Sequence, residues 1–418
     1  MYNIVIKNKP TILINKDFKT IQIKVMFPFE NSIANLANMQ LLPSLLNWKN
    51  NVYKTEESFH IAKNKLFILG YSAYFSAVGC DAEYNFCLSI PNKDVLKNNL
   101  LEEQIKFFSE CIYNPYIEDN KFNEFDLERE KKNLKLGMDN ALKNLKPYQS
   151  IKIKELIDDV GLMKRDIIFH RELIDKVSCD SLYRHYCDTI LNSQPMIYIM
   201  GDVNEKEITD LCNKYLYREN FKEKKIPYQL SSYLLPRNKV KEINEKSNFK
   251  DSSISFVYKI NNFKDDEYVI LNLMRDLLSS LSSRLLNIKL RDENELIYSS
   301  KVISDKYYGI LEITAFIQKN NLNTVKEKIT EAVNDFKNTE LIAPLLDNIK
   351  DRKRINLLRK LDSKYQIFDD FIIHDLGISD TLEEYYEKVL NVTADDIANF
   401  VDKLVLDTIY FIEEEDHE

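Results

Sequence analysis

Apolar and polar residues alternate along residues 21–28, "IQIKVMFP", and this period of two predicts a β-strand with one buried face. Apolar residues three, four or seven positions apart predict a long helix from about Asn123, with the stripe Leu127, Leu134, Met138, Leu142 and Leu145. Pro147 should end that helix because proline has no backbone N–H to donate. Over the whole chain the patterns predict strands at 2–8, 21–28, 70–79, 83–91, 195–204, 253–260, 298–305, 308–317 and 405–414. They predict helices at 32–48, 56–67, 92–113, from 123 to 147, between 147 and 185, from 205, and at 265–291, 322–336 and 342–390.

The order of these elements repeats within the chain. Residues 83–108, "EYNFCLSIPNKDVLKNNLLEEQIKFF", align with residues 308–336, "YGILEITAFIQKNNLNTVKEKITEAVNDF", as strand, turn and helix. We therefore expect an α+β fold of two homologous α/β-roll domains, each a mainly antiparallel sheet with helices packed on one face. The domains are expected at residues 1–215 and 248–418, with a polar linker at 216–247.

Composition limits the possible partners and compartments. A chain of 418 residues is too long for one core, which supports two domains. A formal net charge of -8 argues against nucleic acid as a partner. The 6 cysteines form no C-x-x-C pair, so we expect reduced thiols and a cytoplasmic protein. Lysines interrupt the first apolar stretch, and no apolar run reaches 18 residues, so neither a signal peptide nor a membrane span is expected.

A search for catalytic patterns finds no complete one. The sequence has no G-x-S-x-G, no G-x-x-x-x-G-K and no G-x-G-x-x-G. Its 5 histidines form neither H-x-x-E-H nor H-E-x-x-H. His185 and Cys187 lie near Cys179, but their spacing fits no standard zinc pattern, and packing within a helix explains them better. Taken alone, this search does not suggest an enzyme.

The stretch 282–300, "SSRLLNIKLRDENELIYSS", combines an amphipathic helix, an acidic turn and the start of a strand. Arg291 and Tyr298 stand at this corner, seven residues apart. The simplest interpretation is an exposed Arg paired with Asp292 or Glu295, and a Tyr that opens a strand.

The element order, together with "YIMGDV" at the end of the first half, resembles that of the insulinase-type zinc metallopeptidases, the inverzincin family that includes mitochondrial processing peptidase. Active members carry H-x-x-E-H on a helix that here reads "NMQLLPSLLNWKN", residues 38–50. The matching positions are Gln40, Pro43 and Ser44, where members have two zinc-binding histidines and the Glu that acts as general base. The third ligand, a Glu seven residues after another Glu, is replaced by Gly137, with Glu130 at the earlier position. The resemblance thus implies a degenerate zinc site and no metal cofactor in this chain.

A second part of the family pattern is retained. Members carry S-R-L, then an Arg and a Tyr, and here Ser283, Arg284 and Leu285 lead to Arg291 and Tyr298 at the same spacing. Glu295 stands where many members have Gly. In the family the Arg holds the substrate and the Tyr stabilises the developing oxyanion, so the resemblance implies catalytic roles for Arg291 and Tyr298.

The resemblance also implies where a peptide binds. The strand at 70–79 matches the family's edge strand, on which substrates are expected to add as a further strand. The substrate-binding residues implied are Ser72, Ala73, Tyr74, Phe75 and Ser76 of that strand, together with Arg284. An ordinary sheet strand is the alternative interpretation.

In two-chain members of the family one subunit supplies zinc and the other supplies the Arg and Tyr. The leading hypothesis is therefore a non-zinc subunit of a heterodimeric peptidase, inactive alone, whose homologous partner binds zinc. Its substrate would be a peptide inside the cell, including the leader of a ribosomally made, modified peptide such as a bacteriocin. The alternative is a catalytically dead peptide-binding or scaffold protein of the same fold. A third hypothesis is activity through a different set of metal ligands.

Overall fold

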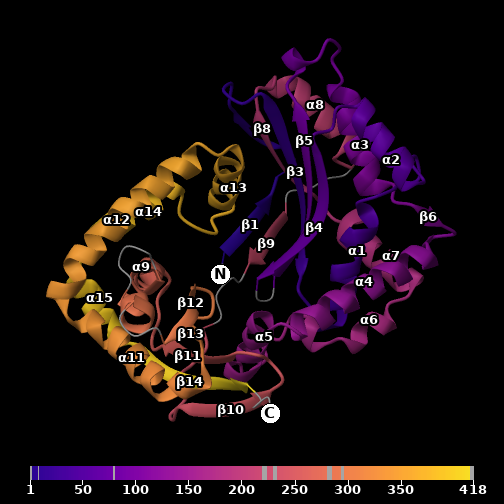
Figure 1. Ribbon diagram of the computed structural model, residues 1–418. Coiled ribbons are helices and arrows are strands. Elements are labelled where there is room, and N and C mark those ends of the chain that lie inside the picture. Colours follow the sequence, from indigo (N-terminus) through magenta and orange to yellow (C-terminus); the bar gives the residue numbers. More distant parts are fainter. Residues whose placement is uncertain are drawn as a thin grey trace. The chain divides into compact units, whose positions relative to one another are not determined.

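The computed structural model describes residues 2–7, 9–78, 81–218, 224–228, 233–279, 285–292 and 296–414 (Figure 1). The chain forms two compact units. The first contains residues 1–140, 165–230 and 371–378, and the second contains residues 141–164, 231–370 and 379–418. Each unit therefore includes a segment from the other half of the sequence.

The first unit is built on a five-stranded sheet in the order β2-β8-β3-β5-β4. Its strands are β2 (Thr11–Ile14), β3 (Thr20–Glu30), β4 (Gly70–Val78), β5 (Asp81–Pro91) and β8 (Met196–Gly201). Strands β2 and β8 are parallel, and the other pairs are antiparallel. The strand β4 lies at one end of the sheet, so its outer edge pairs with no other strand among the described residues.

Helices of the first unit lie along one side of this sheet (Figure 1). The longer ones are α1 (Leu36–Leu46), α2 (Glu56–Lys65), α3 (Leu101–Tyr113), α4 (Glu124–Leu142), α7 (Cys179–Tyr186) and α8 (Glu205–Tyr215). The shorter elements are η1 (Ile33–Asn35), η2 (Lys93–Val95), β6 (Ile117–Glu118), β7 (Lys121–Phe122), η3 (Ile167–Phe169), α6 (Glu172–Lys176) and η4 (Cys187–Leu191). The apolar faces of the helices and strands form one core, which includes Phe27, Leu42, Phe59, Phe108 and Tyr186.

The end of α13 (Lys364–Asp375) also belongs to the first unit. Asp375 accepts hydrogen bonds from the Lys7 ammonium at 2.8 Å and from the Tyr198 hydroxyl at 3.0 Å. The Tyr198 contact holds this segment of the second half to β8, and the Lys7 contact holds it to the residue after β1 (Tyr2–Ile6).

The second unit repeats the sheet in the order β10-β14-β11-β13-β12. Its strands are β10 (Lys241–Ser247), β11 (Ser252–Ile260), β12 (Ile297–Asp305), β13 (Ile310–Ile317) and β14 (Leu404–Glu414). Only β10 and β14 form a parallel pair in it. A separate antiparallel pair joins β1 (Tyr2–Ile6) and β9 (Lys224–Tyr228).

Both faces of the second sheet are covered. One core joins the sheet to α9 (Tyr268–Ser279), α10 (Leu285–Asn287), η6 (Ile288–Asp292), α11 (Leu322–Asn334), η8 (Asp335–Lys337), α12 (Thr339–Leu361), α14 (Leu382–Asn391) and α15 (Ala394–Val401). The short turns η5 (Asp265–Glu267) and η7 (Lys319–Asn321) precede α9 and α11 and have no buried residue. The opposite face packs on α5 (Leu145–Ile157), whose Ile153 and Ile157 lie against Val257 and Tyr410. Among the described residues no helix is long and apolar enough to cross a membrane.

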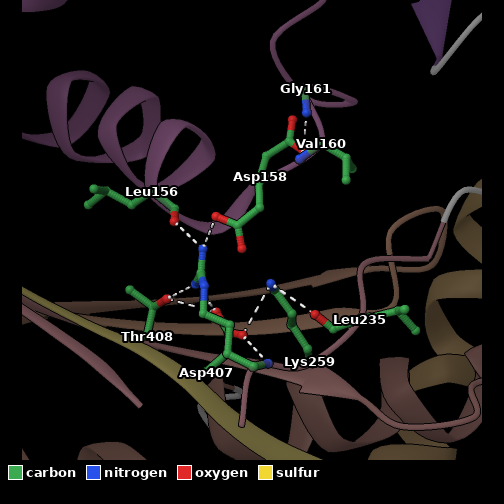
Figure 2. A network of polar contacts seen from close by, with 10 residues as sticks. Leu156, Asp158, Val160, Gly161, Leu235, Lys259, Asp407 and Thr408 are labelled. Carbon is green, nitrogen blue, oxygen red and sulfur yellow. Dashed lines mark hydrogen bonds and ion pairs between the residues drawn. The ribbon is translucent and has the colours of Figure 1, made fainter. Parts of the chain in front are cut away.

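A buried network of charges ties α5 to this sheet (Figure 2). Asp407 is the extra residue of a β-bulge, since Val257 pairs with Thr408 and Tyr258 pairs with Leu406. Its carboxylate lies 2.5 Å from the Arg237 guanidinium and 3.1 Å from the Lys259 ammonium. Arg237 also donates to the Leu156 carbonyl at the end of α5, at 2.8 Å.

The expected fold class is confirmed, including the internal repeat. The aligned segments form β5, η2 and α3 in one half, and β13, η7 and α11 in the other. The long helix does end before Pro147, but proline is not where it ends: α4 ends at Leu142, and Leu145 and Pro147 lie in the first turn of α5, where proline is tolerated. The expected helix start near residue 92 is wrong, because a 3₁₀ turn at Lys93–Val95 precedes the helix that begins at Leu101.

The expected domain boundaries stay a prediction. The segment 216–247, expected to be a linker, contains β9 and β10. The strand β10 forms one end of the second sheet, and Arg237 is anchored to Asp407. The sequence of β10 is polar because none of its residues is buried, so it has no apolar pattern that predicts a strand.

Candidate functional site

The helix α1 presents the positions matched to a zinc site. Its leucines at 41, 42, 45 and 46 are buried in the core, which leaves Gln40 and Ser44 half-buried, one turn apart. Neither side chain makes a hydrogen bond to another described residue. Pro43 is buried inside the helix, where it removes one backbone donor.

The fourth position, Gly137, lies on α4. It is exposed, and a Cβ atom there would meet nothing within 4 Å. Glu130, on the same helix, accepts a hydrogen bond from the Arg129 guanidinium at 2.9 Å. The glycine is therefore not required by close packing, and a larger side chain would fit.

These four residues do not fit a zinc ion. An amide and a hydroxyl are poor zinc ligands, and Pro43 and Gly137 contribute no side-chain donor. Among the described residues there is no group of three or more His, Cys, Asp or Glu side chains that could hold a metal. The structure also gives no metal role to His185, since its ring lies 2.7 Å from the Tyr84 hydroxyl inside the core. Burial lowers the pKa of His185 to about 4.

The strand β4 carries the expected peptide-binding residues at the edge of the first sheet. Ser72 and Tyr74 are exposed on one face, whereas Ala73 is buried and Phe75 is half-buried on the other. The Ser76 hydroxyl donates to Glu83 at 2.9 Å and accepts from Asn85 at 2.9 Å, both on the neighbouring strand β5. Side-chain hydrogen bonds to β5 therefore add to the backbone pairing that fixes β4 in the sheet.

The backbone of β4 also contacts α1 through residues that the sequence did not single out. The Asn47 side chain hydrogen-bonds the backbone N–H and carbonyl of Ala73. The Tyr71 hydroxyl donates to the Leu46 carbonyl at 2.9 Å, and burial raises the pKa of this hydroxyl, so it stays protonated. No local sequence pattern predicts these contacts, because the partners are 25 and 26 residues apart in the chain.

Arg291 lies in η6, a short π-helical segment in the second unit. Segments with this wider helical turn often occur at functional sites. Lys289, in the same segment, forms ion pairs with Glu331 at 3.6 Å and Asp335 at 3.0 Å, which hold η6 against α11 and η8. Arg284 lies outside the described residues.

The two ends of the turn between η6 and β12 are held together. The Leu296 N–H donates to the Leu290 carbonyl at 2.7 Å, and the Leu296 carbonyl accepts from the Asn321 side chain at 3.2 Å. Arg291 directly follows Leu290, and Tyr298 lies two residues after Leu296. The backbone thus brings both expected catalytic positions to one corner of the second unit.

Tyr298 lies in a β-bulge on the outermost strand of the second sheet. Ile297 pairs with Ile317 and Ser299 pairs with Phe316, so Tyr298 has no counterpart on β13. Its side chain is 54% exposed. A bulge changes the direction of a side chain and is common beside active sites, so this geometry presents the phenol to solvent from a rigid sheet.

Comparisons with known proteins agree with this fold. Residues 176–352 match the peptidase M16 inactive domain. A similar protein, the probable inactive metalloprotease YmfF of Bacillus subtilis (strain 168), is 21% identical over 408 residues, covering 96% of this chain and 94% of the relative. A conserved protein from Enterococcus faecalis V583 has a similar structure, with a TM-score of 0.86 and 20% identity over 100% of both chains. A protease from Helicobacter pylori has a TM-score of 0.72 and 15% identity over 98% of both chains.

The sequence that matches this family contains no H-x-x-E-H at any position. The chain is thus similar to the insulinase-type, or M16, metallopeptidases: residues 176–352 match their inactive-domain model, a relative of nearly full length is a probable inactive metalloprotease, and the sequence contains no H-x-x-E-H.

Proposed function

We propose that this protein is the non-zinc subunit of a heterodimeric peptidase, inactive by itself, that contributes Arg291 and Tyr298 to the zinc site of a homologous partner. The observation that carries the proposal is an asymmetry between the two halves. The first half has no side chains suited to zinc at Gln40, Pro43, Ser44 and Gly137, whereas the second half presents an exposed Tyr298 from a bulge.

The chemistry of a peptidase explains why such a pair is useful without a metal in the same chain. When a peptide carbonyl is attacked, negative charge develops on its oxygen, and a hydrogen-bond donor already in place stabilises that charge. The Tyr298 hydroxyl is this donor, and the Arg291 guanidinium holds the substrate backbone. A zinc-bearing partner would supply the nucleophile.

The proposed substrate is a peptide in the cytoplasm, processed or degraded by the pair of subunits, and leader removal from a ribosomally made, modified peptide is one such reaction. The strand β4 supports a peptide substrate because its outer edge faces no other described strand. An extended peptide can add to such an edge through backbone hydrogen bonds alone. The exposed Ser72 and Tyr74 and the half-buried Ser76 would contact alternate side chains of the peptide.

The proposal is tested by purifying this chain alone and together with a homologue that carries H-x-x-E-H. We expect no stoichiometric zinc and no hydrolysis with this chain alone, and peptidase activity in the mixture. In the mixture, Tyr298→Phe should lower kcat by about 100-fold to 1000-fold, as for loss of one oxyanion donor. Tyr365→Phe is the matched control, since Tyr365 is similarly exposed at 55% on α13.

One zinc bound tightly per isolated chain would refute the non-zinc role. Unchanged turnover of the Tyr298→Phe complex would remove Tyr298 from the mechanism.

The second candidate is a peptide-binding scaffold of the same fold. The open edge of β4 favours it independently of Tyr298, since strand addition needs no catalytic group. Peptide binding by the chain with no activity in any mixture would support the scaffold.

A further inference from the structure

The side chain of Asn47 occupies part of the edge at which a peptide would add. Asn47 follows the last residue of α1. Its amide nitrogen donates to the Ala73 carbonyl at 2.8 Å, and its amide oxygen accepts from the Ala73 N–H at 2.7 Å. Both backbone groups of one β4 residue are therefore bound by a single side chain.

The N–H and carbonyl of Ala73 point away from the neighbouring strand β5, toward the outer edge of the sheet. Ala73 faces Phe86 on β5, but its N–H is already bonded to Asn47, so it is directed toward the outer edge. The direction of backbone groups alternates along a strand, so Tyr71, Phe75 and Ala77 also direct their N–H and carbonyl groups outward. An added strand would hydrogen-bond this set, including the groups that Asn47 holds.

The Asn47 carboxamide is a close substitute for one residue of an added strand. It presents one N–H donor and one carbonyl acceptor, as a backbone residue does in an antiparallel pair. Among the described residues, no hydrogen bond to the outward groups of Phe75 or Ala77 is seen. The edge is thus closed at residue 73 and open further along the strand.

Asn47 is held in this position by its surroundings. The second N–H of its amide donates to the Pro43 carbonyl at 3.0 Å, in the preceding turn of α1. The hydrogen bond from Tyr71 to Leu46 fixes the end of α1 to the same strand. Since these contacts are already made, the side chain loses little conformational freedom when it binds Ala73.

We propose that Asn47 determines where a peptide can pair with β4: it closes the edge at Ala73, and a peptide bonds the strand only at Phe75 and Ala77 while Asn47 stays in place. The inference rests on the proposed role of β4 as a peptide-binding edge. It assigns to Asn47 a specificity-determining role, since it shortens the segment of peptide that can be recognised.

Hydrogen exchange of selectively ¹⁵N-labelled alanines in the full chain tests this directly. Ala73 and Ala77 report the closed and the open part of the edge, and the buried Ala82 on β5 is an internal reference. In the native chain Ala73 should be protected and Ala77 unprotected. In Asn47→Leu the Ala73 amide should exchange at least tenfold faster, while Ala82 stays unchanged.

The second measurement uses a fluorescein-labelled ten-residue peptide of alternating Thr and Val with Lys at each end. In the native chain we expect it to protect Ala77 without altering Ala73. In Asn47→Leu it should protect both and bind about tenfold tighter, because two further hydrogen bonds form. Asn47→Asp keeps the acceptor but not the donor, and should bind with intermediate affinity. Asn38→Leu, on the same helix but with no hydrogen bond to β4 among the described residues, should bind like the native chain.

The outcomes separate this inference from the proposed function. If Ala73 exchanges equally slowly in Asn47→Leu, the closure is refuted. Equal peptide affinity in the native chain and Asn47→Leu, with Ala77 protected in both, refutes the specificity role. If the peptide protects neither alanine in any variant, β4 is not a peptide-binding edge and both proposals for it fail, whatever the activity of Tyr298 in a complex.

Discussion

Removal of the buried Asp407 carboxylate should strongly destabilise the second unit. Asp407 is 0% exposed and accepts from the Arg237 backbone N–H at 2.9 Å, the Arg237 guanidinium at 2.5 Å and the Thr408 hydroxyl at 2.8 Å. It also neutralises Lys259, which is 2% exposed. In Asp407→Ala the Lys259 ammonium would keep, among its described partners, the Leu235 carbonyl at 3.2 Å (Figure 2).

Leaving one charge of a buried pair without its partner typically costs about 3–5 kcal/mol. For a unit of this size that corresponds to a decrease in Tm on the order of 10 °C. The double variant Lys259→Met with Asp407→Leu removes Asp407 together with its more buried cation and should cost less than the single one, since Arg237 keeps Asp159 and the Leu156 carbonyl as partners. Asp402→Ala is the control, because Asp402 forms an exposed pair with Lys337 at 2.6 Å and such pairs contribute less than about 1 kcal/mol.

Urea unfolding followed by circular dichroism and by tryptophan fluorescence gives the measurement. The only tryptophan, Trp48, lies in the first unit, so its fluorescence separates unfolding of that unit from loss of secondary structure in the whole chain. A loss below about 1 kcal/mol for Asp407→Ala, or an equal loss in the double variant, would refute the reasoning from buried charge.

Two further predictions concern the first unit. Burial lowers the pKa of His185 to about 4 from an ordinary value of 6.5, so the unfolded chain takes up a proton that the folded chain excludes. The free energy of unfolding should therefore decrease as the pH falls from 6.5 toward 4, by on the order of 3 kcal/mol, and His185→Gln should flatten this dependence in thermal melts from pH 4 to 8. Gly137→Ala should raise the free energy of unfolding by about 0.5–1 kcal/mol in urea titrations, since its Cβ meets nothing within 4 Å; a loss of stability would show that the glycine has a conformational role.

Much of the fold follows from local patterns in the sequence. Alternation of apolar and polar residues predicts β3, and the spacing of apolar residues predicts most of α4, because these periods are properties of one strand or helix. The repeat of strand, turn and helix predicted two similar halves. The resemblance to a family then pointed to Gln40, Pro43 and Ser44, because H-x-x-E-H is a contiguous pattern whose loss is visible in one helix.

Other features could not be read from any local pattern. The segment 216–247 contains a strand of the second sheet because β10 pairs with β14, more than a hundred residues later in the chain. The helix α5, encoded in the first half, covers a face of the second sheet because its Ile153 and Ile157 fit against β11 and β14.

For the candidate site, the sequence by itself determined which chemical groups are present: no good zinc ligand at the four matched positions on α1 and α4, and an Arg and a Tyr seven residues apart. Only the tertiary structure decided how they are presented. The bulge that exposes Tyr298 arises from the pairing of β12 with β13, and the closure of β4 arises from the docking of α1 on Ala73. Both depend on contacts between distant segments: the backbones of β12 and β13 in the first case, and the Asn47 side chain with the Ala73 backbone in the second. No local pattern of side chains predicts such contacts.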